Sequence, residues 1–257
     1  MAARILSWRK EDHVLAVNFS MAANTPEKIA QLSDELFDLC SEAIQEDEIW
    51  VVLIAGTKED SLAMSRDWAK SAVKGDKKKA TQLSSIADPI SKIDRPVIVA
   101  IHGDAIGQGL ELALACDLRI AGETSHFGFP FIQAGLIPWD GGTQRLSRLV
   151  GRGRALEMIL TGRLIDAQEA QRIGLVNRIV PPQRLLTVAR GIAKEMAAKG
   201  PIALRYAKEA IHQGMDLTLR QGLRLEADLY FLLHTSRDRT EGIRAFREKR
   251  VPHFRGE

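Results

Sequence analysis

The stretch RPVIVAIHGDAIGQGLELALACD, residues 95–117, joins a short apolar run to a glycine-containing turn and then to a second apolar run with helical character. The continuous run at 95–103 ends in glycine, which is typical of a strand that is buried on both faces of a parallel sheet. IWVVLIAG at 49–56 repeats the pattern, and LRIAG at 118–122 is a shorter third example. We therefore expect an α/β fold in which buried strands alternate with helices.

Helical patterns lie between and after these strands. The segment at 25–47 begins with Thr-Pro, which suits the first positions of a helix, and its apolar residues recur at helical spacing. Further helices are expected at 77–93 and at roughly 107–116, and another strand at 13–20. After residue 150 most segments are amphipathic and helical, with a last strand signal at 175–180.

The composition is that of an ordinary globular protein, with 45% hydrophobic and 27% charged residues among 257. The net charge of +3 argues against nucleic acid as a partner. The six histidines are scattered and the two cysteines lie far apart, so we expect no metal site and two buried free thiols in a reducing compartment. With an N-terminus charged too early for a signal peptide and no run of ~18 apolar residues, a cytoplasmic location without membrane contact is expected.

The turn after the strand at 95–103 carries the first candidate chemistry. Gly107 and Gly109 flank Gln108 where a helix starts, and N–H groups at a helix start favour an anion or a developing oxyanion. Glu111 follows among apolar neighbours, which raises the cost of its charge and suits acid/base work near neutral pH. A purely local alternative is that Glu111 complements the helix dipole. The loop at 59–70 follows the strand at 49–56 just as the glycine turn follows the strand at 95–103, and loops at the carboxyl ends of parallel strands are expected to line one crevice.

These residues also carry a resemblance. The region from 95 to 181 resembles the signature region of the crotonase (enoyl-CoA hydratase/isomerase) family, and RTEGIRAFREKRVPHFRG at 239–256 is similar to the family's C-terminal motif. The resemblance implies a spiral core of ββα repeats, residues 1–195, followed by a C-terminal helical trimerisation region, residues 196–257. It also implies an acyl-CoA thioester as substrate, no separate cofactor, and a homotrimer or a dimer of trimers.

The resemblance further implies an oxyanion hole of two backbone N–H groups that stabilises a thioester enolate. The first donor would be Ala63 or Met64, and the second would be Gln108, beside Gly107. Arg66 and Trp68 are larger than is usual in the first loop, which suggests a pocket for an unusual acyl group, such as a cyclic or conjugated dienoyl chain.

The family's two catalytic glutamates are only half present. The first matches Glu111, but the second belongs to a Gly-x-Pro-Glu segment that reads GFPF here, so Phe131 stands in its place. Some dienoyl-CoA isomerases and aryl-CoA dehalogenases of the family place an aspartate in the loop that holds Trp139 and Asp140. Asp140 is therefore expected to be a replacement second carboxylate. Alternatively, it caps the turn before the helix at 143–150, or it lines the pocket together with Trp139 and Phe131.

Phe246 and Lys249 match the family's terminal motif and are expected to contact coenzyme A, although Lys249 could equally be a solvated lysine. The expected reaction is reversible hydration of an enoyl-CoA or a cyclic dienoyl-CoA through a stabilised enolate, with Glu111 and Asp140 as acid and base. The alternatives are an isomerase, a hydrolase, dehalogenase or decarboxylase of the same fold, and a non-catalytic acyl-CoA-binding paralogue.

Overall fold

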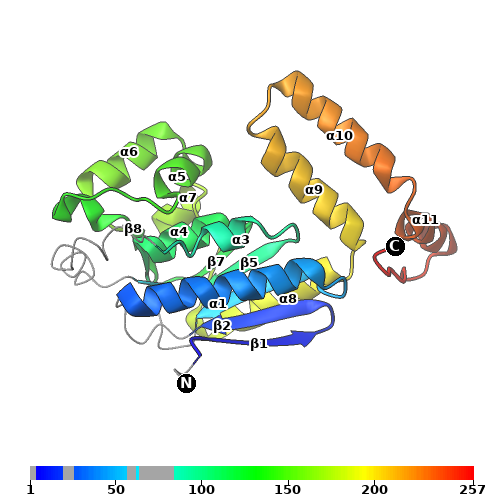
Figure 1. The fold of residues 1–257 in the computed structure, drawn as a ribbon, viewed down its shortest axis with the longest axis horizontal. Coiled ribbons are helices and arrows are strands. Elements are labelled where there is room, and N and C mark those ends of the chain that lie inside the picture. The colour runs from blue at the N-terminus through cyan, green and yellow to red at the C-terminus, as the bar shows by residue number, and fades with distance from the viewer. Residues whose placement is uncertain (1–3, 20–25, 57–61, 64–83) are drawn as a thin grey trace.

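A computed structural model of the chain describes residues 4–19, 26–56, 62–63 and 84–257. Within these ranges the main sheet has six strands in the order β1-β2-β3-β5-β7-β10 (Figure 1). β1 pairs with β2 in antiparallel fashion, and the other neighbouring pairs are parallel. The strands are β1 (Leu6–Glu11), β2 (Val14–Phe19), β3 (Val51–Gly56), β5 (Val97–Ile101), β7 (Leu118–Gly122) and β10 (Arg178–Val180). The buried strands expected at 49–56, 95–103 and 118–122 are confirmed as neighbours in this sheet.

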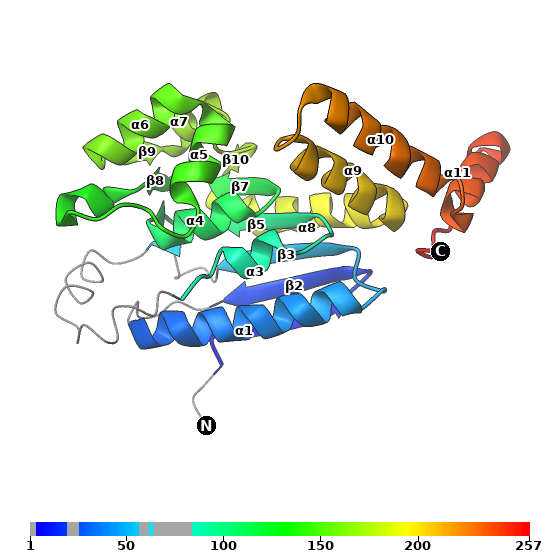
Figure 2. The same ribbon diagram turned by 45° about the horizontal axis from the view of Figure 1, so that its top comes forward.

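Helices cover both faces of the main sheet, as Figure 2 shows for α1 (Pro26–Gln45) and α8 (Leu185–Ala197). Successive side chains of a strand point to opposite faces. In β3, Val52 and Ile54 belong to the apolar cluster that contains α1, whereas Val51 and Leu53 belong to the cluster that contains α8. This two-sided burial explains why the strands read as continuous apolar runs.

A smaller sheet has the strand order β4-β6-β8-β9. Its strands are β4 (Leu62–Ala63), β6 (Ala105–Ile106), β8 (His126–Gly128) and β9 (Ile165–Asp166). β6 begins a few residues after the end of β5, so the small sheet lies next to the carboxyl ends of the parallel strands of the main sheet. The expected helix at roughly 107–116 is confirmed as α4 (Gln108–Ala115), which directly follows β6.

The remaining helices form two groups in Figure 1. α5 (Gly142–Val150), α6 (Arg152–Thr161) and α7 (Ala167–Arg172) lie near α4, whereas α9 (Pro201–Gly214), α10 (Leu219–Leu233) and α11 (Arg237–Glu248) project from the opposite end. The 3-10 helices are η1 (Pro130–Ala134) and η2 (Pro182–Arg184). The domain boundary at 195/196 stays a prediction.

The helix expected at 77–93 differs from the structure in its described part. Residues 77–83 lie outside the described residues, and the rest contains α3, a single turn at Asp88–Ser91. Pro89 has no N–H to donate and is tolerated in the first turn of a helix, so a longer helix through this position is disfavoured. The backbone N–H groups just before α3 donate instead to a side chain from another part of the chain, Asp140.

Asp117 anchors α9 to the core. Its carboxylate accepts hydrogen bonds from Lys208 Nζ at 2.7 Å, from His212 Nε2 at 2.8 Å and from Val97 N at 2.7 Å. Burial alone would raise the pKa of Asp117, but the bonds from His212 and Lys208 and the lysine charge outweigh it and lower that pKa. The projecting helices are therefore tied to the sheet at a charged, largely buried point.

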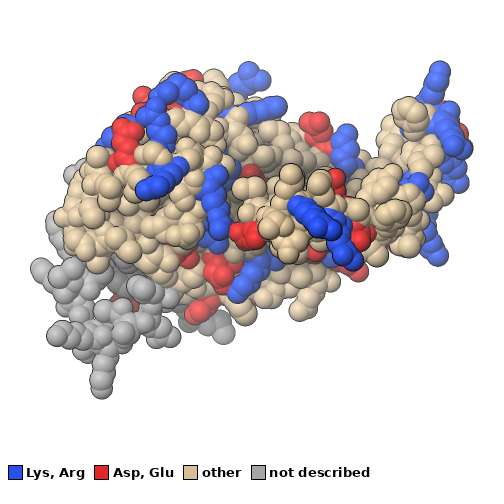
Figure 3. All heavy atoms as spheres, turned by 90° about the horizontal axis from the view of Figure 1, so that it is seen from above, with Lys and Arg blue, Asp and Glu red and all other residues tan. Residues whose placement is uncertain are grey.

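α10 exposes many large apolar side chains. Among the exposed residues of the α9–α10 hairpin are Ile211, Met215, Leu217, Leu219, Leu223, Tyr230, Phe231 and Leu232. In Figure 3 the Lys and Arg side chains are spread over the visible face, including the end at the right that carries α11. Among the described residues, no helix combines the length and the apolar character needed to cross a membrane.

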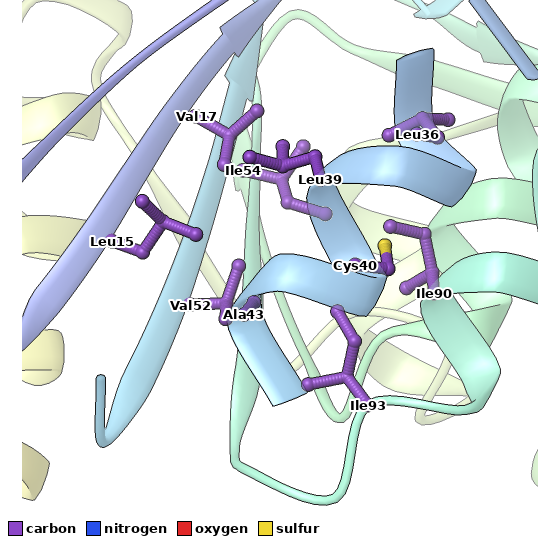
Figure 4. Close-up of a pocket in the computed structure, with 10 residues that line it drawn as sticks. All are labelled: Leu15, Val17, Leu36, Leu39, Cys40, Ala43, Val52, Ile54, Ile90 and Ile93. Carbon is purple, nitrogen blue, oxygen red and sulfur yellow. The ribbon is translucent and has the colours of Figure 1, made fainter. Parts of the chain in front are cut away.

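Between α1 and the main sheet lies an apolar void of about 10 Å³, lined by ten side chains (Figure 4). A void of this size is barely sufficient for one water molecule, and its apolar lining offers that water no partner. Cys40 borders the void, and burial raises the pKa of its thiol to about 12. Burial likewise raises the pKa of Cys116 to about 12, and both cysteines are free thiols, as expected.

Arg119 in β7 is buried against the carboxyl end of α4. Its guanidinium donates to the carbonyl of Cys116 at 2.6 Å, of Ala113 at 3.3 Å and, through Nε, of Leu175 at 2.8 Å. Burial lowers the pKa of Arg119. A cation at this position complements the negative end of the helix dipole and fixes the last turn of α4.

Candidate functional site

Glu111 occupies the centre of the candidate site. It is the fourth residue of α4, and its side chain is fully buried at 0% exposure. Oε1 accepts hydrogen bonds from Asp140 N at 2.8 Å and from Gly142 N at 2.9 Å. Oε2 is buried and accepts no hydrogen bond from the described residues.

Burial raises the pKa of Glu111 to about 7, although the N–H bonds from Gly142 and Asp140 oppose this rise, and the negative charge of Asp140 adds to it. A carboxyl group that titrates near neutral pH can both accept and return a proton. The upward shift expected from the apolar neighbours of Glu111 is therefore present in the structure.

Gly142 has to be small because of Glu111. A Cβ at position 142 would lie 2.9 Å from Glu111 Oε1, 2.8 Å from Pro138 Cβ and 3.0 Å from Phe129 Cζ. Gly141 precedes it with a φ of 99°, a conformation that favours glycine. The double glycine therefore lets the first turn of α5 close onto the carboxylate.

A pair of apolar rings lies on the side of the site where Gly142 is. Phe129 and Phe131 are buried, and their ring centroids lie 6.3 Å apart with planes inclined by 18°. Phe129 reaches the surroundings of Gly142, and Phe131 lies in η1. A phenylalanine can neither activate water nor transfer a proton, so Glu111 lacks the second glutamate that the resemblance leads one to expect.

Asp140 accepts hydrogen bonds from four donors. Its Oδ2 accepts from Ile86 N at 2.9 Å, from Ala87 N at 3.1 Å and from Gln108 Nε2 at 3.1 Å, and its Oδ1 accepts from Ser85 Oγ. The alternative that Asp140 caps the turn before α5 is wrong, because its side-chain bonds go to residues 85–87 and to Gln108, and the N-cap of α5 is Gly141 with no side-chain bond. Asp140 as a second proton carrier stays a prediction.

The two segments expected to form the oxyanion hole lie against each other. Ala63 pairs with Ile106 across β4 and β6, and Gly107, with a φ of 63°, leads from β6 into α4 at Gln108. A Cβ on Gly109 would lie 1.6 Å from the carbonyl oxygen of Leu62, so the backbones of β4 and α4 are in direct contact. The donor assignments stay predictions, and Met64, Arg66 and Trp68 lie outside the described residues.

Trp139 belongs to the same loop as Asp140. Its side chain is partly buried, and its Nε1 donor is buried without a hydrogen-bond partner in the described structure. A buried donor of this kind can bond to a bound molecule. Among the described residues, no group of three or more His, Cys, Asp or Glu side chains is placed to hold a metal ion.

The two residues expected to contact coenzyme A lie elsewhere. Phe246 is in α11 with 85% of its side chain exposed, and Lys249 follows as the C-cap of that helix. Figures 1 and 2 show α11 at the opposite end of the chain from α4. Within one chain, therefore, these two residues do not meet the site around Glu111.

Ser85, Phe129 and Gly142 are site residues that the sequence did not single out. The Gly-Gly pair was interpreted as a turn, and no local signal connected it with Glu111. Ser85 belongs to no motif, and its link to Asp140 spans 55 residues of sequence.

Comparisons with known proteins agree on one family. A family model described as enoyl-CoA hydratase/isomerase matches residues 14–257. The crotonyl-CoA hydratase of Syntrophomonas wolfei is 36% identical over 258 residues, covering 97% of this chain and 96% of that protein. The 2,3-dehydroadipyl-CoA hydratase of Escherichia coli is 45% identical over 167 residues, covering 65% of this chain and 66% of that protein. The crystal structure of a Bacillus anthracis enoyl-CoA hydratase is similar with a TM-score of 0.83 and 36% identity, over 98% of this chain and 100% of that one.

Proposed function

This chain belongs to the enoyl-CoA hydratase/isomerase family and has the crotonase fold, and we propose that it catalyses the reversible addition of water to the double bond of an enoyl-CoA thioester. One observation carries the proposal, namely the buried Glu111 whose pKa lies near 7 and whose Oε1 is held by two N–H groups. That arrangement leaves Oε2 for the water and for the substrate.

A single carboxyl group can complete this reaction. Glu111 takes a proton from water as the hydroxyl adds to the β-carbon, and the electron pair of the double bond moves into the thioester as an enolate. Glu111 then returns the proton to the α-carbon, so it ends in the state in which it began. The N–H groups of Gln108 and of Ala63 or Met64 would stabilise the enolate oxygen, and removing one such donor typically costs ~3 kcal/mol.

Isomerisation is the second candidate, and the rings of Phe129 and Phe131 are the observation that favours it. Phe129 lies next to Gly142, whose N–H bonds to Glu111, and Phe131 lies against Phe129, so an apolar wall on this side would disfavour water. In this reaction Glu111 would remove a proton from one carbon and return it to another, alone or with Asp140. Hydrolysis, dehalogenation, decarboxylation and binding without turnover use the same fold and remain outcomes of the test.

We also propose a homotrimer or a dimer of trimers, supported by the exposed apolar side chains of the α9–α10 hairpin. An assembly of this kind would allow Phe246 and Lys249 to reach coenzyme A on a neighbouring copy. The buried free thiols Cys40 and Cys116 support a reducing, cytoplasmic location.

The test incubates purified protein with three thioesters: crotonyl-CoA, 2,3-dehydroadipyl-CoA and a cyclic dienoyl-CoA. The first two are suggested by the names of the relatives, and the third by the unusual residues Arg66, Trp68 and Phe131. A product heavier by one water, together with loss of enoyl-thioester absorbance, supports hydration. An unchanged mass with a shifted spectrum means isomerisation, and free coenzyme A means hydrolysis. Glu111→Gln is the control for each activity.

A further inference from the structure

We propose that Asp140 is a positioning residue, which fixes the side chains of Glu111 and Gln108 relative to each other and exchanges no proton with the substrate. The proposal rests on the acid/base role of Glu111 proposed above. It assigns Asp140 a different function from the second catalytic carboxylate expected from the resemblance.

The hydrogen bonds of the carboxylate are the first argument. A carboxylate has about four lone-pair directions, and four donors already bond to this one. Two of them are the backbone N–H groups of Ile86 and Ala87, which can only donate. They would therefore oppose a proton on the oxygen to which they bond. The side chain is 6% exposed. These bonds occupy both carboxylate oxygens and leave little room for a substrate atom.

The backbone of the same residue supplies the second argument. The N–H of Asp140 donates to Glu111 Oε1 at 2.8 Å, and its carbonyl accepts from Arg145 Nη1 at 3.0 Å. The residue therefore contacts three elements at once, namely the segment before α3, the first residue of α4 and the first turn of α5. A change in its side chain will move the N–H group that holds Glu111.

The charged groups around Glu111 are few in the described structure. Asp140 and Arg145 lie on the α5 side. α3 begins at Asp88 and is followed by Lys92, and these two side chains pair at 2.6 Å. β4 and β6 consist of apolar residues. The negative charge of Asp140 raises the pKa of Glu111, so a neutral residue at position 140 should lower it.

Asp140→Asn is the decisive variant, because the amide keeps the shape of the side chain but places an NH2 group where a carboxylate oxygen accepts hydrogen bonds. We expect kcat to fall about tenfold to a hundredfold, the range set by losing one charge-assisted hydrogen bond. KM should stay nearly unchanged. The apparent pKa of the kcat profile should move to lower pH while its titrating limb persists. Asp88→Asn is the matched control: it removes an exposed acid whose side chain pairs with Lys92 and not with Asp140, and it keeps the backbone N–H that bonds to Ser85, so the rate and the profile should stay unchanged.

Ser85→Ala tests the position of the Asp140 carboxylate without changing its charge. It removes one donor to Asp140 and keeps the carboxylate, so a smaller fall in kcat is expected without the downward shift that Asp140→Asn causes. A proton-carrying Asp140 predicts a different result, in which Asp140→Asn abolishes turnover as completely as Glu111→Gln and removes a limb of the profile. That outcome overturns the proposal, and so does a wild-type rate and profile in Asp140→Asn.

A measurement without turnover keeps this test independent of the proposed function. Carbon-13 NMR of glutamate-labelled protein gives the pKa of Glu111 directly, with Glu111→Gln identifying its resonance. If no thioester is converted but the resonance titrates at lower pH in Asp140→Asn, the proposed function fails and the link between Asp140 and Glu111 stands. If the wild type hydrates its substrate and the resonance does not move, the positioning proposal alone fails.

Discussion

Replacing Gly109 by alanine should disrupt the contact between α4 and β4. The new Cβ would lie 1.6 Å from Leu62 O, 2.6 Å from Leu62 C and 2.9 Å from Leu62 Cβ. An ordinary contact is at least 3.4 Å, so the two backbones would have to separate by about 1.8 Å. The nearest opposing atoms belong to the backbone, and no flexible side chain can give way.

The separation should act directly on catalysis. The proposed oxyanion donors lie on the two segments that move apart, one at Gln108 in α4 and the other at Ala63 or Met64. A misplacement of about 1 Å can cost about a hundredfold in rate, and losing one oxyanion donor costs a similar factor. We therefore expect kcat to fall by about a hundredfold or more, with a loss of about 1–3 kcal/mol in the free energy of unfolding.

The assay is steady-state hydration of the preferred enoyl-CoA, with a thermal melt and a circular dichroism spectrum to confirm folding. Gly191→Ala is the matched control, because Gly191 lies inside α8 and nothing is within 4 Å of an added Cβ. That variant should be more stable by about 0.5–1 kcal/mol and fully active. A folded Gly109→Ala protein with nearly wild-type kcat would refute the link between this contact and the oxyanion hole.

Three further predictions concern charge and assembly. Glu111→Gln should lower kcat about a hundredfold or more. It should also stabilise the protein at pH 8 by up to about 3 kcal/mol, because burial raises the pKa of Glu111 and so favours its neutral form. In the wild type the stability from the neutral carboxyl is full below about pH 4.5 and is lost as the pH rises through 7, whereas glutamine stays neutral. Equal effects of the substitution at pH 5 and pH 8 in urea denaturation would contradict this. Asp117→Asn should lower the free energy of unfolding by about 1–3 kcal/mol at pH 7. Because the pKa of Asp117 is lowered in the folded state, this difference between variant and wild type should shrink as the pH falls below the unfolded value of 3.8. As the control, Asp216→Asn removes an exposed acid and should change the stability little in the same denaturation series. Phe231→Ser should reduce the molar mass measured by light scattering while helix content is kept, and an unchanged mass would exclude this face from the subunit interface.

The sequence predicted the strands whose burial is two-sided and also the short β10, but it missed the edge strand β1 and the strands of the small sheet. β3 and β5 are buried along their length, so their sequences show continuous apolar runs. β1 is an edge strand with one buried residue, Leu6, and its exposed charges conceal it while discouraging further strand pairing. The strands of the small sheet have two or three residues, too few for any periodicity to appear.

Of the candidate site, the sequence predicted the raised pKa of Glu111, and the catalytic role of that residue stays a prediction. Glu111 stands out because a carboxylate among apolar helix residues needs an explanation, and its raised pKa confirms that reasoning. The partners of Asp140 could not be read from the sequence, because Ile86 and Ala87 donate through backbone groups that almost any residue would supply. Likewise, Gly142 has the sequence signal of a turn, and its contact with Glu111 exists only in the folded chain.

The helix that carries Glu111 is held at both ends. At the first turn of α4 the backbone of Leu62 contacts Gly109, so the helix cannot move closer to β4. At the last turn Arg119 donates hydrogen bonds to the carbonyl groups of Ala113 and Cys116. α4 therefore has little freedom to slide or rotate when different acyl groups bind, and adaptation to a new substrate has to come from the surrounding segments. Natural or laboratory selection for another acyl chain could vary those segments while Glu111, the proposed proton-transferring group, keeps its position.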